Sequence, residues 1–318
     1  MRIDVHSHYL PGAYTAALDR LGHPDAGPAV ARIPGGVVEL EQQIAALDDA
    51  GIDRQVLSVG PLQPQLPGEA AATEAARQAN ELYAEVCRRH ADRFAAFAAV
   101  PLPHVDAALA ELGRALDTLH LAGVTLGCSI AGRGLDDPAF APFFAELDRR
   151  GALLFLQPVG ACGDPLMADY GLSWMLGAPV EDSVAALRLV WSGVAARYPR
   201  VRIIVPHLGG TLPFLLQRLD DHADSFRANG QPVPFDGQPS AYLRRFWYDT
   251  ANGQPAALRC ACESFGADRL LLGSDFPYRK GDKLRHAVTH IEAAGLDPAD
   301  VRAIQGDNAA ALLGLAGA

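Results

Sequence analysis

Two histidines one residue apart, His6 and His8, stand at the end of an apolar segment near the amino terminus. The segment reads RIDVHSH, and residues 2–5 are predicted to form a β-strand. Because side chains alternate between the two faces of a strand, His6 and His8 project to the same side. Paired imidazoles at a strand end favour the binding of a divalent metal.

Three further polar residues follow predicted strands at distant points of the chain. Gln157 follows the run ALLFL, His207 follows IIV in the phrase PHLGG, and Asp275 follows LLL in the phrase GSDFP. If these strands are parallel, their carboxyl ends meet at one face, and the side chains converge there. A lone histidine at a strand end is more often a hydrogen-bonded structural residue. Histidines and an aspartate at several strand ends are a rarer combination, and such donors suit zinc with one position left for water or substrate.

Eight predicted strand–helix pairs must position these side chains. The predicted strands are residues 2–5, 54–59, 94–100, 123–127, 152–156, 201–205, 245–248 and 269–272. The predicted helices are residues 37–50, 70–90, 104–121, 138–150, 180–198, 211–221, 255–265 and 284–294, followed by a helical tail. Eight such alternations predict an α/β fold, the (β/α)8 TIM barrel. The alternative is a doubly wound open sheet, which requires a glycine-rich phosphate turn that HSHYLPG does not provide.

We predict one barrel domain over residues 1–318, with two excursions that lack a clear helix or strand. Residues 160–178 follow Gln157 and include Cys162, Tyr170 and Trp174, so they could cover a substrate at the barrel mouth. The alternative for Trp174 is packing beneath the next helix. Residues 224–240 are rich in glycine, proline and glutamine, and they are a candidate arm for a homodimer.

Composition excludes several classes of protein. The formal net charge is -10, without a block of lysine and arginine, so we expect neither a nucleic-acid partner nor binding to an anionic membrane surface. No stretch approaches the roughly 20 apolar residues that span a bilayer. The five cysteines form no CxxC pair, which predicts reduced thiols. We therefore expect a cytoplasmic protein. Apart from His6, His8 and His207, we expect the seven remaining histidines to be structural or at the surface.

The phrases DVHSH, PHLGG and GSDFPY resemble the amidohydrolase superfamily. The likeness extends to YLRRFWYDTA and the closing NAAALLGL, and it is greatest to the branch around aminocarboxymuconate-semialdehyde decarboxylase. The resemblance implies a metal-dependent barrel that acts on carboxylated aromatic or diene-like acids. It implies zinc as the usual metal, with manganese as an alternative, and often a dimer.

The resemblance also assigns roles to residues. It implies that His6, His8 and Asp275 are metal ligands and that His207 is a catalytic histidine. Arg32 lies about where the branch places an arginine for the substrate carboxylate, although a solvated loop arginine is the alternative. Further candidates for the pocket wall are Trp174, Phe276 and Tyr278, and Arg133 is a second candidate for an inward-pointing cation.

Gln157 departs from this pattern, because the branch usually has a histidine in a phrase such as FVHP, where this chain reads FLQP. Glutamine offers a neutral carbonyl oxygen, which is a harder and usually weaker ligand than imidazole. Three outcomes stay open. Gln157 binds the metal through oxygen, or it stands off and contacts substrate beside a three-ligand metal, or the site has lost its metal.

Three functions are compatible with these residues. The first is non-oxidative decarboxylation, in which the metal binds the substrate carboxylate and Asp275 or His207 protonates the carbon that bears it. The second is metal-dependent hydrolysis of an ester, lactone, thioester or amide, or a hydratase reaction, with Asp275 as the base. The third is a non-catalytic barrel, which only Gln157 supports. The decarboxylase is preferred, with a small carboxylate as its substrate, and no residue identifies that acid further.

Overall fold

Eight parallel strands form the centre of the molecule in a computed structural model that describes residues 1–24, 26–160, 165–251 and 253–315. They are β1 (Ile3–His8), β2 (Arg54–Ser58), β3 (Phe94–Ala98), β4 (Gly123–Gly127), β7 (Leu153–Gln157), β8 (Arg202–Val205), β9 (Trp247–Asp249) and β10 (Leu270–Leu271). Each strand pairs with the next one in this order. Two backbone hydrogen bonds then close the ring, from the Val5 N–H to the Leu272 carbonyl (2.9 Å) and from the His8 N–H to the Phe276 carbonyl (2.7 Å).

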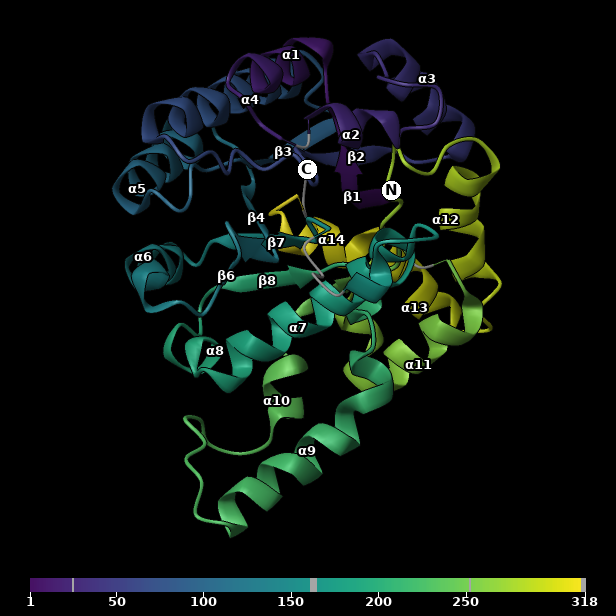
Figure 1. The fold of residues 1–318 in the computed structure, drawn as a ribbon. Coiled ribbons are helices and arrows are strands. Elements are labelled where there is room, and N and C mark those ends of the chain that lie inside the picture. Colours follow the sequence, from purple (N-terminus) through teal and green to yellow (C-terminus); the bar gives the residue numbers. More distant parts are fainter. Residues whose placement is uncertain (25, 161–164, 252, 316–318) are drawn as a thin grey trace.

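Helices surround this ring, as Figure 1 shows. They are α1 (Gly12–Arg20), α2 (Ala26–Ala31), α3 (Leu40–Ala50), α4 (Glu69–Arg89), α5 (Val105–Gly113), α6 (Ala141–Arg150), α7 (Ala178–Trp191), α8 (Val194–Arg197), α9 (Leu212–Ala228), α10 (Pro239–Leu243), α11 (Pro255–Phe265), α12 (Asp282–Glu292), α13 (Pro298–Arg302) and α14 (Asn308–Leu312). A capping box of Glu39 and Gln42 begins α3, and Gly51 ends it with a φ of 67°, where a side chain would be strained. The predicted (β/α)8 barrel is confirmed.

Two apolar layers hold the barrel together. The inner layer fills the barrel with residues from alternate strand positions, among them Val5, Phe97 and Phe155, and the rings of the last two stack at 5.4 Å. The larger outer layer lies between strands and helices. The predicted helical tail closes one end of the barrel, because Leu312 of α14 packs into the inner layer.

Both predicted excursions contain helical structure that the sequence pattern did not indicate. In the first, the described part includes a 3-10 turn at Pro165–Met167 and a π-helical turn at Ser173–Gly177 that leads directly into α7. In the second, α9 continues to Ala228 and α10 begins at Pro239, so only residues 229–238 are irregular. Figure 1 shows α9 extending away from the barrel.

Other expectations concern thiols and membranes. Cys87, Cys128, Cys260 and Cys262 are free, as predicted, whereas Cys162 lies outside the described residues. Within the described ranges, we find no helix with the length and apolar character needed to cross a bilayer.

Candidate active site and metal centre

His6 and His8 belong to β1 itself, rather than following it, and both side chains are fully buried. Their rings lie 5.1 Å apart. His6 Nδ1 is 2.8 Å from Asp249 Oδ2, and since a carboxylate only accepts, Nδ1 carries the proton. The Nε2 atom of His6 therefore has a free lone pair, and it is buried without a hydrogen-bond partner.

His8 is oriented in the same way by a hydroxyl group. Its Nδ1 lies 2.8 Å from Ser58 Oγ, whose own proton goes to the Ser7 carbonyl at 3.2 Å. Ser58 thus accepts a hydrogen bond from His8 Nδ1, and His8 Nε2 also carries a lone pair.

Asp275 faces both of these nitrogen atoms. Its Oδ1 lies 3.3 Å from His8 Nε2 and 3.5 Å from His6 Nε2, and the ligand atoms of the three residues all lie within 4.8 Å of one another. The backbone of Asp275 has a φ of 60°, an uncommon conformation for a residue with a side chain. Burial would raise the pKa of this carboxyl, but the nearby imidazoles of His8, His6 and His207 outweigh it and lower the pKa. Three electron-pair donors without a proton between them fit a divalent cation.

His207 lies at the wall of the same site. Its ring is 5.2 Å from that of His6, and its Nδ1 is 2.8 Å from Asp182 Oδ2. Burial would lower the pKa of His207, but the hydrogen bond to Asp182 and the charges of Asp182, Asp275 and Asp249 raise it to about 9. His207 therefore presents Nε2 to the pocket as a potential proton donor.

A tight turn holds His207 in place. His207 has a φ of 53°, and Gly210 has a φ of 62°. A Cβ atom at Gly210 would lie 2.0 Å from the Pro179 carbonyl oxygen, so only glycine fits there. Backbone geometry thus requires glycine at position 210, and this glycine allows the turn that positions His207.

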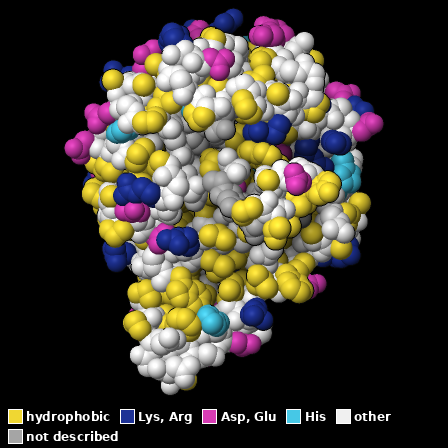
Figure 2. All heavy atoms as spheres, viewed as in Figure 1, with side chains coloured by type: hydrophobic (Ala, Val, Ile, Leu, Met, Phe, Trp, Pro, Cys, Tyr) yellow, Lys and Arg dark blue, Asp and Glu magenta, His cyan; other side chains and the backbone are white. Residues whose placement is uncertain are grey.

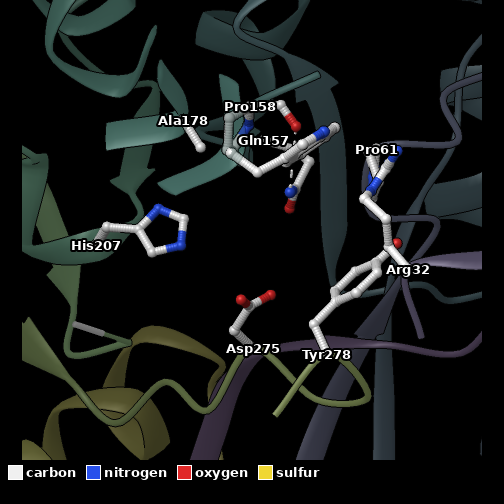
Figure 3. Close-up of a pocket in the computed structure, with 9 residues that line it drawn as sticks. Arg32, Pro61, Gln157, Pro158, Ala178, His207, Asp275 and Tyr278 are labelled. Carbon is white, nitrogen blue, oxygen red and sulfur yellow. Dashed lines mark hydrogen bonds between the residues drawn. The ribbon is translucent and has the colours of Figure 1, made fainter. Parts of the chain in front are cut away.

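The cluster of His6, His8 and Asp275 lies at a pocket of about 360 Å³, which Asp275 and His207 line and whose size is typical of small-molecule sites. Its lining includes Arg32, Gln157, Trp174, His207, Asp275 and Tyr278. Figure 3 labels all of these except Trp174. The structure therefore brings together most of the residues that the sequence selected.

Trp174 has a side-chain neighbour that the sequence did not indicate. The guanidinium of Arg32 lies over its ring, 4.0 Å from the ring centre, so the π-helical turn and the segment after α2 meet above the pocket. Trp174 can orient Arg32 by cation–π attraction.

Two sequence candidates lie away from the pocket. The Phe276 side chain is 1% exposed and packs in the outer core layer, where it does not line the cavity. It was selected because it flanks Asp275, but its side chain packs into the core between strands and helices. Arg133 does not point inward, because it pairs with Asp137 at 2.8 Å and lies over Phe140.

Sequence reasoning missed Asp249, Asp182 and Ser58, which orient the three histidines. A signal existed for Asp249, which directly follows the predicted strand 245–248 in the phrase FWYDT. None existed for Asp182, because an acidic residue on an amphipathic helix is usually solvated.

Comparison with known proteins agrees with this geometry. The family model described as amidohydrolase matches residues 3–315. The 6-methylsalicylic acid decarboxylase of Penicillium expansum is 33% identical over 98% of this chain and 95% of its own length. The 2-amino-3-carboxymuconate-6-semialdehyde decarboxylase of Dictyostelium discoideum is 27% identical over 89% and 83%.

Solved structures show the same fold. The 5-carboxyvanillate decarboxylase of Sphingomonas paucimobilis has a TM-score of 0.87 and 27% identity, covering 98% of each chain. A dihydroxybenzoic acid decarboxylase of Polaromonas sp. JS666, solved with manganese and 2-nitroresorcinol, has a TM-score of 0.84 and 26% identity, covering 100% of this chain and 98% of the relative.

The chain therefore belongs to the amidohydrolase family of metal-dependent (β/α)8 barrels. Within it, the chain falls in the branch that contains aminocarboxymuconate-semialdehyde decarboxylase, and it is an enzyme of the carboxy-lyase type.

Proposed function

We propose that this protein is a metal-dependent decarboxylase that removes carbon dioxide, without oxidation, from an aromatic carboxylic acid. The observation that carries the proposal is the position of His207 beside the cluster of His6, His8 and Asp275 in one pocket. Relatives over nearly the whole chain are decarboxylases of 6-methylsalicylic acid and 5-carboxyvanillate, both of which are aromatic acids.

His6, His8 and Asp275 would hold one divalent cation. When bound, it supplies positive charge that attracts the substrate carboxylate and an adjacent oxygen and stabilises negative charge that develops in the reaction. Imidazole donors favour zinc, whereas manganese is bound in the Polaromonas relative. We propose zinc or manganese as the resident metal.

Arg32, Gln157 and Trp174 shape the substrate end of the pocket. Arg32 would attract a carboxylate in a protein whose net charge is -10, and Trp174 would hold the guanidinium in position. The Gln157 amide and the Tyr278 ring form another part of the pocket wall. A planar ring with one acidic group fits such a pocket.

His207 would supply the proton. Asp182 binds Nδ1, so Nε2 points toward the pocket and delivers its proton to the ring carbon that bears the carboxylate. The bond between that carbon and the carboxylate carbon then breaks, its electron pair returns to the ring, and carbon dioxide leaves. Asp275 would act as a ligand of the cation, together with His6 and His8.

Replacing Asp275 by asparagine tests this assignment. The variant should lose bound metal, as measured by inductively coupled plasma mass spectrometry, and should lose turnover of 6-methylsalicylate or a related acid while its circular dichroism is unchanged. Full turnover by Asp275→Asn would refute the role of Asp275.

We also propose a homodimer in the cytoplasm. Three large apolar side chains near the described part of residues 160–178 and the start of α9 are strongly exposed: Leu166 (83%), Tyr170 (92%) and Phe214 (86%). Figure 2 shows several hydrophobic side chains gathered on the face of the molecule in view. A second copy covering them would explain their exposure, and the free thiols fit a reducing compartment. Light scattering on Phe214→Asp tests the dimer, which the substitution should weaken.

A further inference from the structure

Gln157 occupies a distinctive position at the end of β7. Its side chain lies on the same side of the strand as that of Phe155, two residues earlier, whose ring contacts the His6 ring at 5.1 Å. Gln157 therefore lies beyond this contact, at the carboxyl end of the barrel where the metal-binding residues converge. It is 3% exposed.

The two ends of the Gln157 amide have different surroundings. Its Nε2 donates a long hydrogen bond to the Pro158 carbonyl at 3.4 Å, which leaves Oε1 on the pocket side of the amide. Its Oε1 is buried and accepts no hydrogen bond from any residue that the structure describes. Figure 3 shows the amide pointing into the pocket between His207 and Tyr278, and the carboxylate of Asp275 points toward it. An acceptor in this situation requires a partner.

His6 Nε2 shares this property, because it is also buried, unpartnered and equipped with a lone pair. His8 Nε2 and Asp275 Oδ1 complete a set of atoms that accept and do not donate. A neutral hydrogen-bond donor satisfies at most one or two such atoms. A cation satisfies all of them at once.

We infer that Gln157 is a direct ligand of the metal through Oε1, and that it lowers the preference of the site for zinc over manganese. The ligand set then comprises two imidazole nitrogens and two oxygens. Carbonyl and carboxylate oxygens suit manganese, whereas imidazole suits zinc. This inference rests on the metal site of the proposed function and specifies one of its ligands.

The test compares the wild type with Gln157→His and Gln157→Ala after removal of metal by a chelator. Zinc affinity is measured by competition with a chromophoric chelator, and manganese affinity by the loss of the free Mn²⁺ signal in electron paramagnetic resonance. Gln157→His should bind zinc about 10- to 100-fold more tightly relative to manganese than the wild type does. Gln157→Ala should bind manganese about 10-fold more weakly.

Gln65 provides a matched control. Its amide lies near the same end of the barrel, but both ends are occupied: Nε2 donates to the Ser129 carbonyl at 2.9 Å, and Oε1 accepts from the Ala131 N–H at 2.8 Å. Gln65→Ala should leave both metal affinities unchanged, and circular dichroism checks that all variants fold.

Two results would overturn the inference, and they are distinguishable. If both Gln157 variants bind zinc and manganese as the wild type does, Gln157 is no ligand, although the metal site remains. A change confined to the affinity for 2-nitroresorcinol would then assign Gln157 to substrate binding. If the wild type binds neither metal, the proposed function fails together with the inference.

Discussion

The carboxylate of Asp249 connects the metal site to the proposed proton donor. Its Oδ2 lies 2.8 Å from His6 Nδ1, and its Oδ1 accepts the backbone N–H of His207 at 3.1 Å. Asp249 is completely buried, so both contacts are shielded from water. One side chain therefore fixes the tautomer of His6 and the position of the turn that carries His207.

Replacing Asp249 by asparagine should weaken metal binding by about 10- to 100-fold, because an amide supports the His6 tautomer less well and carries no charge. The zinc dissociation constant from chelator competition measures this effect. Asp236→Asn, at an exposed position, is the control. Unchanged affinity in Asp249→Asn would show that this carboxylate does not support the metal ligand.

Replacing Asp182 by asparagine should lower the pKa of His207, which is about 9 in the intact site. In the proposed reaction the acid form of His207 is the active one, so activity should fall as the pH rises through this pKa. In Asp182→Asn, the alkaline limb of the kcat profile should move to lower pH, and kcat at its optimum should fall by about 10²-fold or more. A lower kcat with an unmoved alkaline limb would assign the proton to another group.

Removing the Arg32 guanidinium should raise KM for the acid by about 10- to 100-fold, because a charge-assisted hydrogen bond to the carboxylate is lost. Trp174→Ala should raise KM in the same direction, whereas Trp174→Phe should retain most of the affinity because it keeps an aromatic face for Arg32. Arg133→Ala is the control, since Arg133 binds Asp137 away from the pocket. An unchanged KM in Arg32→Ala would contradict the carboxylate contact.

Asn80 is a test of how the fold is held together. Its amide accepts the Ala99 N–H at 2.8 Å and donates to the Ala99 carbonyl and to Glu111 Oε1, so it ties α4 to the segment after β3 and to α5. Asn80→Ala leaves these buried groups unpaired and should lower the free energy of unfolding by about 2–3 kcal/mol. Urea denaturation measures it, and Gln78→Ala should have little effect, because Gln78 is half-buried on α4 and its amide donates only to Glu74 at the surface.

The sequence pattern predicted the barrel well where local signals are strong. The predicted strand 123–127 and helix 255–265 coincide with β4 and α11, because a buried apolar run and a proline-initiated amphipathic helix are both local features. Helices α1 and α2 were not predicted, since glycine and proline interrupt their apolar pattern. The end of α9 was assigned to a loop because its last turns are polar and extend from the barrel.

The site was predicted less completely than the fold. Position at a strand end identified His6, His8, His207 and Asp275, because strand order alone brings such residues together. The orientation of each imidazole depends on side chains from other elements, such as Asp182 on α7, and this depends on tertiary packing. For the same reason, the sequence did not indicate that Trp174 would face Arg32.

The most direct test of the central claim is the decarboxylation reaction in deuterium oxide. The metal-loaded enzyme is incubated with 6-methylsalicylate, 5-carboxyvanillate and a dihydroxybenzoate, and carbon dioxide and the product are measured by mass spectrometry. We predict that at least one acid releases carbon dioxide in equal amount to a product carrying one deuterium at the carbon that bore the carboxylate. Activity should disappear with a chelator and return with zinc or manganese. A metal-loaded enzyme that releases no carbon dioxide from any of them, but hydrolyses an aryl ester or lactone, would contradict the account.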